Sequence, residues 1–250
     1  MSTPKPTIIL VHGAFHGPWC FSPLSHSLRA KSLPCIDDLA LPSAGSARPL
    51  QVDVEALRAV LHQVIDKDGN DCVLVMHSYG GVVGGEAIRG FGVKDRGAGP
   101  CVRRTVYIAT SLPVVGQSHW ELTAEWAAKS GVDMGSVAEI RDDGEVAWIA
   151  SPEMFYNGLP KEKQEEMSGK LKTQSVAALG TPVEYAGHSD SPGWFLMCTK
   201  DLVVSLAQQK YIVALPGVDI ERSEEIETGH TPFLTHPDEV ADFIARAAEV

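Results

Sequence analysis

Apolar and polar positions along the chain form two kinds of segment. Short apolar runs bounded by turn residues occur at residues 7–11, 72–76, 105–109 and 194–198, and weaker strand candidates lie at 33–36 and 219–226. Continuous runs of this length are typical of strands that are buried on both faces, as in a parallel sheet covered by helices.

Between these runs, apolar residues recur at helical spacing. One such face is formed by Val54, Leu57, Leu61 and Val64, and another, after a Pro237 suited to a first helical turn, by Val240, Phe243, Ile244 and Ala247. The alternation of strands and helices predicts a doubly wound α/β fold, with a mostly parallel sheet of about six strands flanked by helices.

Residues 112–182 break this rhythm. They show no obvious strand–helix–strand unit, and among charged stretches they carry Trp120, Trp126, Trp148, Phe155 and Tyr156. Loops of this length in a compact domain are more often functional lids than idle ones. We therefore expect a mainly helical cap at 112–182, inserted into a core formed by 1–111 and 183–250. The alternative is a peripheral excursion without a role in the site.

Composition narrows the class of protein. The chain has 250 residues, a formal net charge of −11 and 44% hydrophobic residues, which suits one globular domain and argues against nucleic-acid binding. Its five scattered cysteines include no C-x-x-C pair, as expected in a reducing compartment and not in a disulfide scaffold or zinc site. The first apolar run is too short for a signal peptide or membrane span. We expect a cytoplasmic monomer or homodimer with no membrane partner.

Ser78 is the strongest candidate for chemistry. It lies in Val-Leu-Val-Met-His-Ser-Tyr-Gly-Gly at residues 73–81, between an apolar run and the helix-compatible residues 82–89. A serine on a sharp strand-to-helix turn is a nucleophile elbow, which exposes the hydroxyl at the carboxyl edge of a parallel sheet. The usual motif is G-x-S-x-G, and Met76 replaces its first glycine here.

A serine nucleophile needs a base and a group that orients the base. Asp201 follows the 194–198 run, and His230 follows the 219–226 run in Glu-Thr-Gly-His-Thr-Pro. Both are thus expected at carboxyl ends of strands, the edge where ligands bind in open α/β sheets. The order serine, acid, histidine matches the hydrolase order. Asp190 is a rival acid, but it precedes its strand.

A tetrahedral intermediate also needs two hydrogen-bond donors for its oxyanion. The residue after the nucleophile, Tyr79, supplies one backbone N–H. The loop His-Gly-Ala-Phe-His-Gly-Pro-Trp at residues 12–19 directly follows the first strand candidate. We expect the second donor from this loop, as the N–H of Ala14 or of Phe15.

These motifs together resemble the α/β-hydrolases, and within them the small capped enzymes related to plant methylesterases and hydroxynitrile lyases. The matching pieces are the 12–19 loop, His-Ser-Tyr-Gly-Gly, Cys-Thr-Lys-Asp and Gly-His-Thr-Pro-Phe-Leu-Thr-His-Pro. The resemblance implies a Ser78–His230–Asp201 triad with Tyr79 and Ala14 as oxyanion donors. Cyanohydrin-cleaving members carry a threonine and a lysine where this chain has Gly13 and Thr231, so the charge that stabilises cyanide in those lyases is missing here.

The other candidate residues are assigned to the pocket or to the scaffold. His12 is expected to support the 12–19 loop, which we call the oxyanion loop. It has no second ligand at the spacing that a metal site requires. Aromatic residues of the cap suggest an apolar pocket, and the candidate pocket residues are His16, Trp120, Trp126, Trp148 and Phe155. The glycines after Ser78 fit neither a G-K-[ST] nor a G-x-G-x-x-G pattern. We therefore expect neither a cofactor nor a metal.

Three functions fit these residues. The first is a serine hydrolase that cleaves a small-to-medium apolar carboxylic ester or lactone through an acyl-enzyme. The second keeps the triad but acts as a lyase or cyclase on a β-dicarbonyl or polyketide-like substrate, since the fold does not determine the reaction. The third is a ligand-binding homologue without catalysis.

Overall fold

A computed structural model of the chain describes residues 5–131 and 133–249. Its core is a six-stranded sheet in the order β2-β1-β3-β4-β8-β9, and all neighbouring strands run parallel. The strands are β1 Thr7–Val11, β2 Cys35–Ile36, β3 Cys72–His77, β4 Val102–Ile108, β8 Gly193–Cys198 and β9 Ile220–Ile226. The predicted α/β fold with a six-stranded parallel sheet is confirmed.

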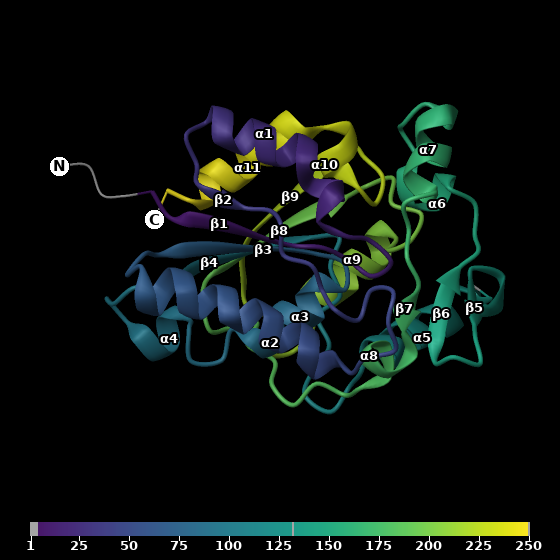
Figure 1. Cartoon of the computed structure of the whole chain (residues 1–250), viewed down its shortest axis with the longest axis horizontal. Coiled ribbons are helices and arrows are strands. Elements are labelled where there is room, and N and C mark those ends of the chain that lie inside the picture. Colours follow the sequence, from purple (N-terminus) through teal and green to yellow (C-terminus); the bar gives the residue numbers. More distant parts are fainter. Residues whose placement is uncertain (1–4, 132, 250) are drawn as a thin grey trace.

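Helices cover both faces of the sheet (Figure 1). One face carries α1 Ser22–Ala30, α10 Pro232–Thr235 and α11 Pro237–Ala247, and the other carries α2 Leu50–Leu61, α3 Gly80–Ala87 and α4 Val93–Arg96. Shorter turns of helix extend two of them, η1 Pro18–Phe21 and η2 His62–Lys67, and α9 Leu206–Val213 follows β8.

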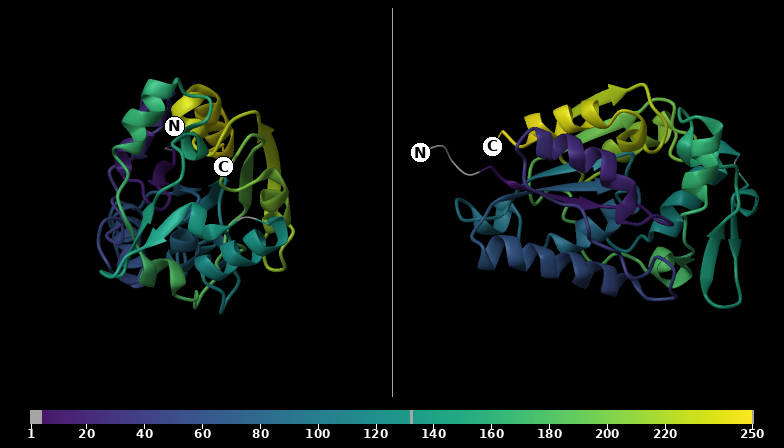
Figure 2. Two further views of the ribbon diagram at one scale, coloured as in Figure 1. Left: turned by 90° about the vertical axis from the view of Figure 1, so that its right-hand side faces the viewer. Right: turned by 45° about the horizontal axis from the view of Figure 1, so that its top comes forward.

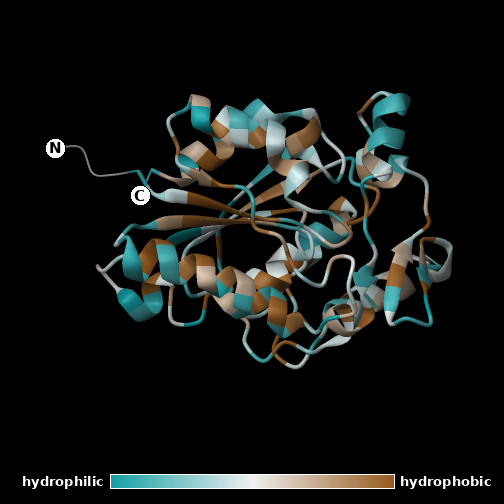
Figure 3. Ribbon diagram, in the orientation of Figure 1, coloured by the Kyte–Doolittle hydropathy of each residue, from teal (hydrophilic) through white to brown (hydrophobic). Residues whose placement is uncertain are grey.

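Alternate residues of each strand feed two separate cores. In β1, Ile8 and Leu10 pack with the α1 and α11 side, whereas Ile9 and Val11 pack with the α2 and α3 side. This follows from the two-residue period of a strand, which turns successive side chains to opposite faces. Figure 3 shows the resulting hydrophobic strands between helices that are polar on their outer surfaces.

The start of β4 differs most from the predicted strand boundaries. β4 begins at Val102, three residues before the predicted start, because Arg103 and Arg104 lie inside the strand at its half-buried amino end. Arg104 donates from Nε to the Ala247 carbonyl at 3.0 Å. Polar side chains at the amino end of β4 thus hide the start of an otherwise apolar strand from the sequence pattern.

Residues 112–182 lie beyond the carboxyl ends of the core strands, at the right of Figure 1 and facing the viewer in the left panel of Figure 2. Their helices are α5 His119–Ser130, α6 Glu153–Tyr156, α7 Lys161–Ser168 and α8 Val176–Gly180, with the short turn η3 Met134–Ser136. They also contain an antiparallel sheet that the sequence did not predict, made of β5 Ala138–Ile140, β6 Glu145–Trp148 and β7 Gln174–Ser175. These strands are too short to show a hydrophobic period.

None of the helices in residues 5–131 and 133–249 combines the length and the apolar character that a membrane crossing requires.

Met76 and Gly84 account for the departure from the G-x-S-x-G motif. Met76 is 1% exposed in β3, and a Cβ added to Gly84 on α3 would lie 2.1 Å from the Met76 Sδ. The methionine side chain therefore occupies the space beside a helical glycine. A long residue fits at this position of the elbow because α3 has no side chain at the facing position.

Replacing Gly84 with alanine is expected to lower the free energy of unfolding by about 1–3 kcal/mol, because the new methyl group overpacks the core against Met76. Gly180 on α8 is the matched control, since a Cβ there meets no atom within 4 Å, and Gly180→Ala is expected to be neutral or slightly stabilising. Urea unfolding of both variants measures the difference. An equal cost in the Met76→Ala background would contradict this contact.

Candidate active site

Ser78 lies on a strained turn between β3 and α3. Its φ angle is +51°, in the left-handed region that a non-glycine residue adopts only where its surroundings hold it. The Ser78 N–H donates to the Ile108 carbonyl at 3.2 Å, and the Ser78 carbonyl accepts from Gly81 N–H at 3.1 Å. A Cβ at Gly13 would lie only 2.9 Å from the Ser78 Cβ, so the first loop passes directly over the serine.

Asp201 and His230 form a buried pair. Their side chains are 0% and 1% exposed, and His230 Nδ1 lies 2.8 Å from Asp201 Oδ2. Asp201 Oδ1 accepts hydrogen bonds from the N–H groups of Val203 at 2.7 Å and Val204 at 2.8 Å. The two backbone donors fix the carboxylate, which leaves its other oxygen to orient the imidazole.

The opposite nitrogen of this imidazole is free. His230 Nε2 is buried and has no hydrogen-bond partner within the described residues. The rival acid, Asp190, is occupied elsewhere, because its Oδ2 accepts from the Tyr185 hydroxyl at 2.6 Å. Of the two carboxylates considered from the sequence, the structure brings Asp201 to His230.

The backbone around Ser78 offers two unoccupied donors. The N–H groups of Ala14 and Tyr79 make no hydrogen bond to another described residue. Tyr79 is also the residue that precedes α3, so the positive end of the helix dipole faces this position. The N–H of Phe15, the alternative donor, is occupied, since it donates to the side-chain Oε1 of Gln174 at 3.2 Å. Ala14 is therefore the better-placed donor of the loop.

Two loop histidines act as scaffold. His12 Nδ1 lies 2.8 Å from the Gly13 carbonyl, and its Nε2 accepts from the Leu41 N–H. His16 Nδ1 lies 2.9 Å from the Ala14 carbonyl, and its Nε2 lies 3.1 Å from the Tyr156 hydroxyl. Burial lowers the pKa of His12 to about 4 and that of His16 to about 3. Both rings are neutral near pH 7 and fix the loop through hydrogen bonds.

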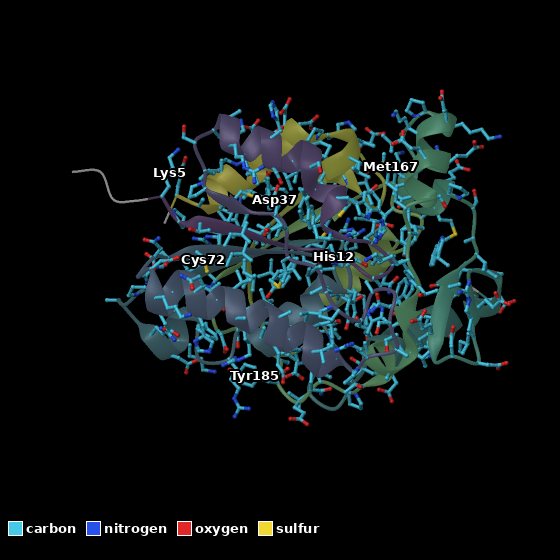
Figure 4. The ribbon with its side chains drawn as sticks, viewed as in Figure 1. Lys5, His12, Asp37, Cys72, Met167 and Tyr185 are labelled. Carbon is cyan, nitrogen blue, oxygen red and sulfur yellow. The ribbon has the colours of Figure 1, made fainter. Side chains whose placement is uncertain are left out.

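His77 supports the candidate base from behind. Its Nε2 lies 2.9 Å from the His230 backbone carbonyl, and burial lowers its pKa well below the ordinary value. The neutral His77 ring therefore donates its Nε2–H to this carbonyl and holds the loop that carries His230. Figure 4 locates this edge of the sheet, because His12 directly follows β1 there and Cys72, at the start of β3, lies at the opposite end.

Ser78 opens into a cavity of about 90 Å³ beneath residues 112–182. Apolar side chains dominate its wall, among them Phe15, Trp120, Val146, Trp148, Phe155 and Leu179. Ligand cavities for drug-sized molecules are several times larger. The cavity therefore suits a small apolar group next to the nucleophile.

Two predicted pocket residues lie outside this cavity. His16 is engaged on both ring nitrogens, and Trp126 packs on Tyr211 with ring centroids 6.0 Å apart. Trp126 instead lines a neighbouring cavity of about 180 Å³. The two cavities share Thr123, Trp148, Val203 and Gln208 in their walls, so Trp126 lines a space that adjoins the Ser78 cavity.

Sequence reasoning missed several polar residues of the site. His119 and Gln208 line the Ser78 cavity, and burial lowers the pKa of His119 to about 4. Asp53 is fully buried and accepts a hydrogen bond from the Tyr79 hydroxyl at 3.0 Å. Its signal was present, because a carboxylate three residues after Leu50 and four before Leu57 falls on the apolar face of α2. Gln174 gave no such signal.

Known proteins confirm the family that these motifs resemble. A family model described as "Alpha/beta hydrolase family" matches residues 8–243. The chain belongs to the alpha/beta hydrolase family. Alpha/beta hydrolase nvfD of Aspergillus novofumigatus is 30% identical over 254 residues, which cover 98% of this chain and 97% of that protein.

Two further proteins that are similar to this chain carry esterase names. Esterase PIR7B of Oryza sativa subsp. japonica is 27% identical over 270 residues, covering 99% of this chain and 97% of that protein. The crystal structure of methylesterase MES16 from Arabidopsis superposes with a TM-score of 0.74, at 20% identity, over 97% of this chain and 98% of the other. The fold of the methylesterase-like group is thus shared. Family membership and these relatives support hydrolase activity for this chain.

Proposed function

We propose that this chain hydrolyses a small-to-medium apolar carboxylic ester or lactone, with Ser78 as nucleophile, His230 as base and Asp201 as orienting acid. The observation that carries the proposal is the 2.8 Å contact between His230 Nδ1 and Asp201 Oδ2, with the unpartnered Nε2 of the same ring and Ser78 at the cavity wall. A base that is oriented by an acid and has a free nitrogen is what a serine nucleophile requires.

The reaction follows the order of a serine hydrolase. Ser78 Oγ attacks the carbonyl carbon of the ester while His230 Nε2 accepts the hydroxyl proton. The oxyanion that forms accepts hydrogen bonds from the Ala14 and Tyr79 N–H groups. The tetrahedral intermediate then expels the alcohol, which takes the proton from His230. Water attacks the acyl-enzyme by the same route and releases the carboxylic acid and free Ser78.

The charge on Asp201 stabilises the imidazolium that forms in each step. The two backbone N–H donors to its Oδ1 hold the carboxylate so that Oδ2 stays next to His230 Nδ1. Residues 112–182 supply most of the apolar wall of the cavity and reduce the access of water, which strengthens the hydrogen bonds to the oxyanion. We therefore propose that this segment acts as a cap.

A panel of substrates tests the proposal. Aryl and alkyl esters of short and medium acids, γ- and δ-lactones and β-ketoesters are incubated with the purified protein, and acid release is followed by pH-stat titration. We expect turnover of the apolar esters or lactones, with preference for small acyl groups because the cavity is small. Absence of acid release from every member of the panel would contradict the proposal.

His119 favours a second candidate reaction, on β-dicarbonyl substrates. It lines the Ser78 cavity, and its Nδ1 is buried without a partner within the described residues. A neutral imidazole can polarise a carbonyl oxygen, so His119 would bind one oxygen of the substrate and the oxyanion donors the other. A carbon–carbon cleavage or cyclisation of the β-ketoester, followed by mass spectrometry, with no hydrolysis of simple esters would support this reaction.

A further inference from the structure

A buried carboxyl group lies behind the candidate nucleophile. Asp53 on α2 is 0% exposed and forms no ion pair with a described Lys or Arg. Instead it collects hydrogen bonds from neutral donors. Its Oδ2 accepts from the Tyr79 hydroxyl at 3.0 Å and from the Ser43 hydroxyl, and its Oδ1 accepts from the Ser43 N–H at 2.9 Å. Burying a carboxyl group costs free energy unless its oxygens are hydrogen-bonded, so each of these donors must stay in place.

The hydrogen bonds continue from Asp53 to the cap segment. Gln174 is 1% exposed, and its Nε2 donates to Ser43 Oγ at 2.5 Å. Its other amide atom, Oε1, accepts from the Phe15 N–H at 3.2 Å. The Ser43 proton is directed to Asp53, so Ser43 Oγ can only accept from Gln174. The amide orientation is therefore fixed, and its oxygen must face Phe15.

Backbone hydrogen bonds hold the same segments together. The Phe15 carbonyl accepts from Lys172 N–H at 2.8 Å, and the Ser43 carbonyl accepts from Ser175 N–H at 3.0 Å. Phe15 itself has a φ angle of +65°, a conformation that a non-glycine residue keeps only under such restraint. The oxyanion loop is thus held in its strained shape by residues 172–175.

The two ends of this network are the two positions that matter for the oxyanion. At one end, Asp53 binds the side chain of Tyr79, whose backbone N–H is a candidate donor. At the other end, Gln174 binds the N–H of Phe15, the residue next to the second donor, Ala14. One buried network therefore contacts both Tyr79 and the residue next to Ala14.

We propose that Gln174, with Ser43 and Asp53, is a positioning residue that sets the Ala14 and Tyr79 N–H groups for the oxyanion. By this network the cap segment completes the active site, besides covering it. The proposal rests on the proposed function and adds a role for residues that touch neither substrate nor nucleophile. The network then lowers the free energy of the transition state and not that of the bound ester, since an oxyanion is present only in the former.

Gln174→Met tests the proposal, because methionine has a similar length and cannot hydrogen bond to Ser43 or Phe15. On the preferred ester of the panel we expect kcat to fall about 10- to 100-fold, with KM changed less than about threefold. The pH at which activity falls on the acid side is expected to stay that of the parent, since the His230–Asp201 pair is untouched. The rate of Ser78 labelling by a fluorophosphonate is expected to fall with kcat, because that reaction also develops charge on an oxygen.

Gln164→Met is the matched control. Gln164 belongs to the same segment, on α7, and its amide also makes a hydrogen bond, to the Leu159 carbonyl at 2.9 Å. Parental kcat and KM are expected. Tyr79→Phe is the second variant, which removes only the hydroxyl that binds Asp53. We expect kcat to fall in this variant too, but less than in Gln174→Met. It decides the question if Gln174→Met does not fold.

The outcomes separate the two proposals. A folded Gln174→Met protein with parental kcat would overturn the positioning role, as would a loss confined to KM. If Gln174→Met does not fold, parental kcat in Tyr79→Phe would overturn it. A parent protein that neither hydrolyses any ester nor reacts with the fluorophosphonate would overturn the proposed function itself, and the positioning role with it.

Discussion

Replacing Ser78 with alanine is expected to lower ester turnover by about 10⁴-fold or more, because no other group at this position can form the acyl-enzyme. The serine is in a strained conformation at the end of β3, with φ of +51°, and lines the cavity. The measurement is kcat/KM on the preferred ester, with far-UV circular dichroism and thermal melting to verify the fold.

Ser168→Ala is the control for this variant. Ser168 is the last residue of α7, outside the wall of the Ser78 cavity, and its replacement is expected to leave kcat/KM at the parental value. Equal turnover in Ser78→Ala and the parent would show that another group carries the reaction. A loss of similar size in Ser168→Ala would show that the assay reports stability and not chemistry.

The second large effect is expected from Asp201→Asn, which replaces one carboxylate oxygen by an NH₂ group. Asp201 Oδ1 accepts from Val203 and Val204 N–H, and Oδ2 faces His230 Nδ1. In the variant, the asparagine oxygen must stay with the two backbone donors. Its amide N–H₂ then faces His230 Nδ1, which can only accept, so the ring proton moves to Nε2. The imidazole can no longer take the Ser78 proton, and kcat is expected to fall by about 10⁴-fold.

Asp190→Asn is the matched control for this exchange, since Asp190 is also a buried aspartate, with a side chain that is 2% exposed against 0% for Asp201. Its contact is with the Tyr185 hydroxyl, away from His230. We expect a change in melting temperature and little change in kcat. Comparison of the two kcat values at pH 7.5 decides the role, and near-parental kcat in Asp201→Asn would contradict the orienting function.

The parallel core could be predicted from the sequence because its signals are local. Each central strand contains an apolar run, and β1 and β8 are found within one residue of the predicted bounds. Ser78 and Asp201 follow such runs, and His230 follows the weaker strand β9, so the topology of a parallel sheet alone places them at one edge. The fold and the approximate place of the site follow from chain order.

Contacts between distant segments could not be predicted in this way. Gln174 reaches Phe15 across 159 positions of the chain, and nothing near Gln174 distinguishes it from a surface glutamine. Trp126 shows the converse, since an aromatic residue in the cap faces Tyr211 and not Ser78. Which side chains of a cap reach the site depends on how the short helices and β5–β7 pack, which no local period reveals.

Met76 illustrates how a local rule fails for a local reason. The position is usually glycine because the elbow packs tightly, and here Gly84 on the facing helix provides the missing space. The departure from the motif therefore has a steric explanation in the core. It leaves Ser78 free to act as the nucleophile.

The central claim is that Ser78 is the nucleophile activated by His230 and Asp201. Its most direct test is intact-mass and peptide mass spectrometry after treatment with a fluorophosphonate. We predict a single adduct, located at Ser78 and lost in both Ser78→Ala and His230→Ala. An unmodified parent protein, or an adduct located on any other residue, would contradict the account.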